Sequence, residues 1–114
     1  MDQICLVVPV LPGKTAEARA FMRELDTVRR AEYDRSERRI GITKEVWYLA
    51  PMSSGDQLVG YMETADFPRA LQQFSQSRDA FDVWFKERMR TVTGLDLDHP
   101  PADGLPELLS TYEA

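Results

Sequence analysis

The order of helix and strand signals in this 114-residue chain predicts an α+β fold of the ferredoxin-like type, β-α-β-β-α-β. Three observations predict it: an apolar, β-branched run at Ile4–Val10, two strand-like runs joined by a turn at 53–56, and a helical stretch on each side of that hairpin. A short strand at Leu95-Asp96-Leu97 completes the pattern. The fold would hold a four-stranded antiparallel sheet with helices on one face.

The first strand, Ile4–Val10, is apolar at both parities, which is typical of a strand whose two faces are both covered. Thr15 is suited to cap the helix that follows. Apolar residues recur at helical spacing as far as Val28. The polar, arginine-rich stretch 29–39 is expected to continue this helix, unbroken or slightly broken, until Gly41, and to present a solvated face.

The hairpin is predicted from strands at Thr43–Ala50 and Gln57–Thr64. Asp66 then begins a second helical stretch. A second start signal at Ser77 and a stop signal at Gly94 indicate that this helix is kinked or has two parts.

The chain is long enough for one domain, which we expect at residues 1–98. His99-Pro100-Pro101 interrupts regular structure. Residues 99–114 are expected to form an extension that packs on the body or on a partner subunit, with Leu105–Tyr112 able to form a short helix.

Composition and charge exclude several classes of protein. Hydrophobic residues make up 43% and charged residues 29%, as in ordinary globular domains. The net charge of −5 disfavours nucleic-acid binding, which requires clustered basic residues. Cys5 is the only cysteine, so we expect a reducing, cytoplasmic location and no thiolate metal site. The longest apolar run, Ile4–Leu11, is too short for a membrane helix, and no signal peptide, metal or cofactor is expected.

Both faces of the predicted sheet carry large apolar side chains. Helices cover only one face of a ferredoxin-like sheet, so the other face would leave an apolar patch in water. A second copy of the chain is the simplest cover, and we therefore expect a homodimer that pairs through the sheet face.

Three segments resemble the dimeric α/β-barrel superfamily: Val10-Leu11-Pro12-Gly13-Lys14, Lys44-Glu45-Val46-Trp47 and the aromatic stretch 81–86. The chain looks closest to uncharacterised members that are related to antibiotic-biosynthesis-type monooxygenases and to stress-responsive barrel proteins. The resemblance implies a fold and a homodimer. It also implies a cleft between sheet and helices in which members of the superfamily hold aromatic or polyketide-like ligands.

Candidate site residues are few. His99 is the only histidine and the first candidate for a catalytic base, although its place beside Asp98 and Pro100 favours a surface loop. Tyr61 is the second catalytic candidate, because a tyrosine hydroxyl could orient a substrate. Candidate ligand-binding residues are the aromatic side chains that could line the cleft and the mid-strand glycine that could admit a ligand or a bulky neighbour: Trp47, Tyr48, Gly60, Phe81, Trp84 and Phe85.

Carboxylates offer a further possibility. Glu45 and Glu63 lie in the two hairpin strands, and they would repel each other if they were opposite one another. A carboxyl group in a dry cleft has a raised pKa and can act as an acid or a base. The simpler interpretation is that strand-end acids face solvent or pair with arginine.

The sequence contains no diagnostic catalytic motif, so three functions stay open. The first is a homodimeric protein of uncharacterised function that binds a small hydrophobic or aromatic molecule. The second is a cofactor-independent monooxygenase or lyase that acts on an aromatic or polyketide-like substrate. The third is a non-catalytic protein-interaction module. A cleft filled by the protein's own side chains would favour the third.

Overall fold

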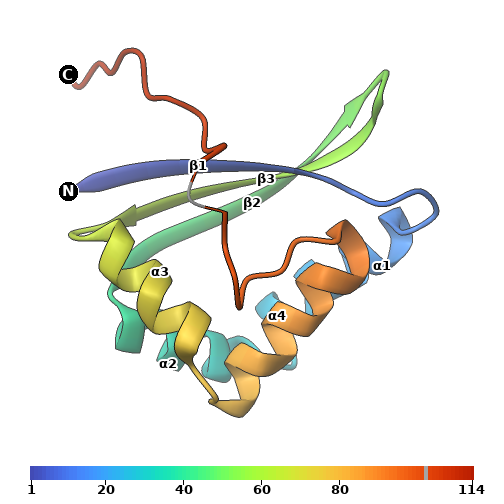
Figure 1. Ribbon diagram of the computed structural model, residues 1–114, viewed down its shortest axis with the longest axis horizontal. Coiled ribbons are helices and arrows are strands. Elements are labelled where there is room, and N and C mark those ends of the chain that lie inside the picture. Colours follow the sequence, from blue (N-terminus) through green and yellow to red (C-terminus); the bar gives the residue numbers. More distant parts are fainter. Residues whose placement is uncertain (102) are drawn as a thin grey trace.

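A three-stranded antiparallel sheet with four helices on one of its faces makes up the described part of this computed structural model, residues 1–101 and 103–114 (Figure 1). The elements in chain order are β1 (Asp2–Pro9), α1 (Thr15–Asp26), α2 (Arg30–Ile40), β2 (Ile42–Met52), β3 (Gly55–Thr64), α3 (Phe67–Gln76) and α4 (Ala80–Thr93). The strand order is β1-β3-β2, which is the order that a ferredoxin-like fold gives its first three strands. The predicted α+β class is therefore confirmed.

The predicted fourth strand at Leu95–Leu97 is wrong. After α4 the chain turns at Leu97-Asp98, and β1 pairs only with β3 among the described residues. The physical reason lies in two ion pairs that hold this segment against α4. Arg90 Nη2 lies 2.9 Å from Asp96 Oδ1, and Lys86 Nζ lies 2.7 Å from an oxygen of Asp98. The segment is thus tied to the helix, away from the free edge of β1.

The first helical stretch is two helices rather than one. The helix is interrupted at 27–29, where the N–H groups of Thr27 and Arg29 both donate to the carbonyl oxygen of Glu24. The stretch ends at Gly41, as predicted, because this residue takes the left-handed conformation with a φ of 86°. Thr15 does not cap α1. It lies inside the helix, and its hydroxyl donates to Asp56 in the hairpin at 2.7 Å.

The second helical stretch has two parts, as predicted. The Asp66 side chain accepts a hydrogen bond from the Arg69 N–H and caps α3, and the Asp79 side chain accepts one from the Phe81 N–H and caps α4. Gly94 ends α4 in the left-handed conformation.

The hairpin contains an irregularity that decides which residues face the helices. Ile42 pairs with Thr64 and Lys44 pairs with Glu63, so Thr43 is an extra residue in β2 and forms a bulge. A bulge reverses the side-chain alternation that follows it. Ile42 and Glu45 therefore both point to the helix side of the sheet, as do Trp47 and Leu49 further along the strand.

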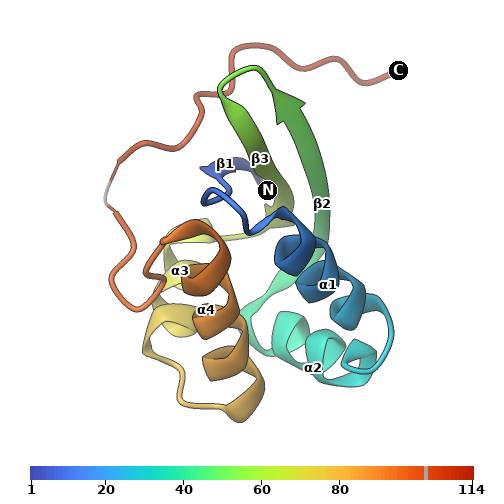
Figure 2. The same ribbon diagram turned by 90° about the vertical axis from the view of Figure 1, so that its right-hand side faces the viewer.

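The core lies between this face of the sheet and the helices. Its largest fully buried apolar members come from α1, β3 and α4: Phe21, Leu25, Leu58, Met89 and Val92. Figure 2 shows the helices as two pairs on the same side of the sheet, α1 with α2 and α3 with α4. The opposite face carries no helix, and Val7 and Tyr48 are 45% and 61% exposed there.

The C-terminal segment runs from α4 past the sheet and ends on the side away from the helices (Figures 1 and 2). Leu105–Tyr112 forms no helix, and Leu108, Leu109 and Tyr112 are largely exposed. No helix of the described residues has the length and apolar character needed to cross a membrane.

Candidate functional site

A cavity of about 310 Å³ lies between the helix-facing side of the sheet, α2, α3, α4 and the start of the C-terminal segment. Its lining is mainly apolar. The aliphatic part includes Ile40, Ile42, Met62, Ala70 and Leu71. Trp47, Phe74, Phe81 and Phe85 add aromatic rings, and Pro100 and Pro101 close one side. The cavity is thus a mainly apolar, ring-lined space directly under the sheet.

Three carboxyl side chains interrupt this apolar lining: Asp103 of the C-terminal segment, and a pair under the sheet. Glu37 comes from α2 and Glu45 from β2, and the two side chains are within hydrogen-bonding range of each other. Their meeting depends on local structure: the bulge at Thr43 turns Glu45 inward, and helical spacing places Glu37 one turn after Tyr33 on the buried side of α2.

Glu45 has two hydrogen-bond donors of its own. Trp47 Nε1 donates to Glu45 Oε2 at 3.0 Å, and the Tyr33 hydroxyl donates to the same oxygen. Donors that face a carboxylate stabilise its charged form. Glu37 has no such support, because its Oε2 is buried with no hydrogen-bond donor among the described residues. Glu45 therefore has hydrogen-bond donors that Glu37 lacks.

The pKa values follow from this asymmetry. Burial raises the pKa of Glu37 from its ordinary 4.5 to about 10, and the charges of Glu45 and Asp82 and the hydrogen bond to Glu45 add to the effect. Burial also raises the pKa of the Tyr33 hydroxyl, with the charge of Glu45 as the second cause. At neutral pH, Glu37 is consequently a neutral carboxylic acid.

A second, more polar hollow of about 590 Å³ lies on the outer side of the pair. Arg30, Arg38 and Lys44 line it together with the Tyr33 side chain. Glu37, Ile42 and Glu45 line both spaces. The carboxyl pair therefore separates the apolar cavity from a hollow with basic side chains.

A buried ion-pair network fixes the helices around the pair. Asp82 of α4 is fully buried, accepts hydrogen bonds from the Ser36 and Ser77 hydroxyls at 2.5 Å, and pairs with Arg39 of α2. Lys86 donates to the carbonyl oxygens of Ser75 and Ser77 at 3.1 Å. Every polar group in this network has partners, so its role is structural.

The cavity brings together three of the residues that the sequence singled out: Trp47, Phe81 and Phe85. Gly60 lies directly beneath the first of them, because a Cβ at this position would be 2.7 Å from the Trp47 ring. The glycine thus makes room for a bulky neighbour, the Trp47 indole.

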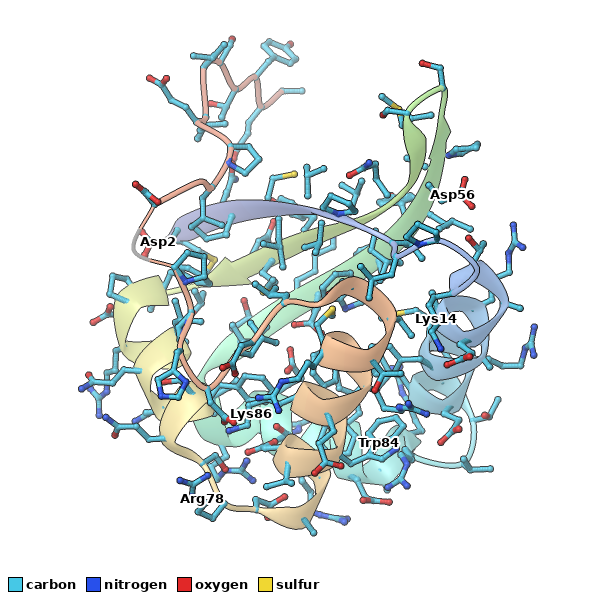
Figure 3. The ribbon with its side chains drawn as sticks, turned by 45° about the vertical axis from the view of Figure 1, so that its right-hand side comes forward. Asp2, Lys14, Asp56, Arg78, Trp84 and Lys86 are labelled. Carbon is cyan, nitrogen blue, oxygen red and sulfur yellow. The ribbon has the colours of Figure 1, made fainter. Side chains whose placement is uncertain are left out.

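Trp84 and Tyr48 lie elsewhere. Trp84 packs against Phe21 and Phe81, and the Arg29 guanidinium lies 4.0 Å from its ring centroid. Figure 3 shows Trp84 and Lys86 leaving α4 on opposite sides, Trp84 toward α1 and Lys86 toward α3. Tyr48 is exposed on the open face of the sheet.

The two catalytic candidates do not reach the cavity. The His99 side chain is 86% exposed, and its Nδ1 lies 3.1 Å from Asp96. Tyr61 occupies the open face of the sheet, where its hydroxyl donates to Glu63 at 2.6 Å and this bond raises its pKa. Glu63 is opposite Lys44 rather than Glu45. The two hairpin glutamates are therefore not opposite one another.

Sequence reasoning missed Tyr33 and Glu37, which it assigned to a solvated face. The signal was present: buried or half-buried Tyr33, Ser36, Glu37 and Ile40 follow an i, i+3, i+4, i+7 pattern. Arginines between these positions concealed the stripe. Among residues 1–101 and 103–114, no group of three His, Cys, Asp or Glu side chains is placed to hold a metal ion.

Similarity to known proteins identifies a family and a fold. A model of a family of unknown function, DUF6176, matches residues 1–111. No curated protein sequence matches the chain. Among solved structures, the chain is similar to tetracenomycin F2 cyclase from Streptomyces glaucescens, a type-II polyketide cyclase, with a TM-score of 0.59 and 17% identity over 100% of this chain and 99% of that chain. At this identity the similarity shows a common α+β fold.

Proposed function

The chain belongs to the DUF6176 family, whose function is unknown, and from its cavity we propose that it binds a small, largely apolar molecule between the sheet and the helices. The observation that carries this proposal is the cavity itself. Its volume of about 310 Å³ lies at the lower end of the range of small-molecule sites, and its apolar lining with few polar groups is typical of them.

The aromatic lining favours a ligand with a flat ring system. Trp47, Phe81 and Phe85 present rings to one space, and aromatic rings bind one another in edge-to-face or offset arrangements. The polyketide cyclase named above has the same fold, which is compatible with such a ligand; its activity is not transferred to this chain on a shared fold alone.

The alternative of a non-catalytic interaction module is less well supported. That alternative requires the aromatic side chains to fill the space under the sheet as core. Phe74, Phe81 and Phe85 do pack against one another, with ring centroids 5.5 to 6.3 Å apart, yet the cavity beside them remains open. A core without a ligand role would be expected to close such a space, because voids in protein interiors cost stability.

An acid-base enzyme is the second candidate function, and the carboxyl pair favours it. A neutral Glu37 supplies an acid, and the neighbouring Glu45, which accepts from Trp47, is the candidate base in the same site. A lyase needs only these two roles and no cofactor. A cofactor-independent monooxygenase needs dioxygen as well, and no group described above is specific for dioxygen.

A blocking variant tests the binding proposal. Leu71 lines the cavity from α3, and Leu71→Trp should fill it, whereas Gln72→Trp adds the same ring on the exposed side of the same helix. A thermal-shift series with naphthalene-sized aromatic probes should raise the melting temperature of the wild type and of Gln72→Trp but not of Leu71→Trp. Equal shifts in all three proteins would place binding outside the cavity.

We also propose that the chain forms a homodimer through the open face of its sheet. Val7, Tyr48 and Met52 are 45 to 61% exposed, and all three lie on strands that no helix covers on this side. A second copy would remove this apolar surface from water through a twofold interface. The exposed leucines of the C-terminal segment end on the same side and would add to it.

A further inference from the structure

The lining residues of the cavity indicate which polar group a bound molecule would carry, which the volume alone does not. The charged side chains of the lining are Glu37, Glu45 and Asp103, and Asp103 is exposed on the C-terminal segment, so a polar group of a bound molecule that lies against α2 and β2 has the carboxyl pair as its partner. This step rests on the proposed function, because it concerns a molecule held in that cavity.

The two carboxyl groups offer different hydrogen-bonding capacity. Glu45 Oε2 already accepts from the Trp47 indole and the Tyr33 hydroxyl. Glu37 is the neutral partner, and a neutral carboxylic acid carries one O–H donor. Glu37 Oε2 has no partner among the described residues, so without a ligand this proton is directed at Glu45 or toward the outer hollow.

Arg30, Arg38 and Lys44 face Glu37 from the outer hollow, whereas the charges that raise its pKa are negative. Glu45 approaches from β2 and Asp82 from α4, and the Tyr33 hydroxyl lies beside the pair on its own helix. A negatively charged ligand group would meet the same repulsion that keeps Glu37 neutral. A neutral acceptor would instead complete the hydrogen bonding of the Glu37 O–H.

We propose that the Glu37–Glu45 pair is a recognition site for the carbonyl oxygen of a neutral aromatic ketone or quinone-like molecule, with Glu37 as the donor and Glu45 as the positioning residue. Binding turns the Glu37 O–H from Glu45 to the carbonyl oxygen of the ligand. No covalent bond forms or breaks in this step, and the proton stays on Glu37. Tyr33 and Trp47 hold Glu45 in place throughout by their hydrogen bonds.

The outer hollow explains how the pair keeps its proton while the cavity is occupied. Glu37 and Glu45 face the hollow as well as the cavity. Proton exchange with solvent can therefore proceed on the side of Arg30, Arg38 and Lys44, without passage through the ligand. A ligand that fills the apolar side leaves this second side open.

Three ring-matched probes test the proposal on the unmodified protein: 2-acetylnaphthalene, 2-ethylnaphthalene and 2-naphthoate, titrated by calorimetry at about pH 7. The ketone should bind about tenfold more tightly than the hydrocarbon, as expected for one added hydrogen bond in a dry site, and the carboxylate should bind most weakly. Because the pKa of Glu37 is about 10, the ketone preference should persist from about pH 6 to about pH 9.

The outcomes separate this inference from the proposed function. Equal binding of ketone and hydrocarbon would overturn the inference and leave the cavity as an apolar site. Preferred binding of 2-naphthoate would overturn it as well, because the carboxyl pair would then not repel an anion. Binding of none of the three probes would contradict both proposals.

Two variants of Glu37 assign the preference to this side chain. Glu37→Met has similar length and no donor, so it should bind the ketone and the hydrocarbon equally. Glu37→Gln keeps an N–H donor and should retain most of the preference. Circular dichroism would establish that both variants fold. If Glu37→Met kept the full ketone preference, the assignment to Glu37 would be wrong.

Discussion

At the scale of single residues, the state of Glu37 links the site to stability. Its pKa of about 10 in the folded protein exceeds the ordinary value of 4.5. Between these two pH values the folded chain therefore holds a proton that the unfolded chain releases. The contribution of this group to stability is fully present below about pH 4.5 and is lost as pH rises toward 10, by at most about 1.4 kcal/mol per pH unit.

Glu37→Gln should remove this dependence, because the amide has no proton to lose. We expect the variant to gain stability relative to the wild type as pH rises, with a larger difference at about pH 8.5 than at about pH 5.5. Urea unfolding at the two pH values measures it. Glu32→Gln is the control on the same helix, since Glu32 is partly exposed and lies 3.4 Å from Arg29. Parallel pH profiles for wild type and Glu37→Gln would contradict a buried neutral acid.

Gly60 gives a second residue-scale prediction. A Cβ at Gly60 would overlap the Trp47 ring at 2.7 Å, so Gly60→Ala should lower the free energy of unfolding by about 1–3 kcal/mol, as overpacking does. In a Trp47→Phe background the ring is smaller, so Gly60→Ala should lower the free energy of unfolding by less. Chemical denaturation of the four proteins completes this cycle. An equal cost in both backgrounds would mean that Trp47 is not what requires the glycine.

At the scale of elements, Asp82 couples α2 to α4 and thereby sets the position of Glu37. Breaking a buried charge network by removal of one partner is costly, so Asp82→Ala should destabilise the protein by about 3 kcal/mol. Asp34→Ala is the matched control, because Asp34 forms an exposed pair with Arg38 and its loss should cost under about 1 kcal/mol. Thermal unfolding compares the two. Similar small losses would show that Asp82 is not an essential link.

Local signals predicted most elements. Both hairpin strands, the two-part second helix and the end of α2 at Gly41 follow from alternation, Asp caps and glycine stops, which act over a few residues. The prediction of a fourth strand was wrong because Lys86 and Arg90 of α4 hold the segment that follows the helix. These contacts depend on the tertiary fold.

The candidate site was less predictable, for a related reason. Trp47, Phe81 and Phe85 stood out by residue type and do line the cavity. Glu37 did not stand out by residue type, because it is buried only when α2 packs against β2. The residue pattern of β2 does not predict the bulge at Thr43. This bulge turns Glu45 toward the cavity that Glu37 also lines.

At the scale of the whole molecule, the open sheet face predicts assembly. Analytical ultracentrifugation at micromolar concentration should find a dimer, and Tyr48→Glu should shift the population toward monomer by placing a charge in the interface. Glu87→Gln, on the exposed side of α4, is a control that should leave the dimer intact. A wild-type protein that sediments as a monomer would refute the predicted interface.

The central claim is that the cavity between the sheet and the helices is the ligand site, and locating a bound probe tests it most directly. In a nuclear magnetic resonance experiment with methyl-labelled protein, the ring protons of 2-acetylnaphthalene should show intermolecular nuclear Overhauser effects to methyl groups of Ile42, Met62 and Leu71, which line the cavity. Contacts instead to Met52 and Leu109, on the exposed surface, would contradict the account.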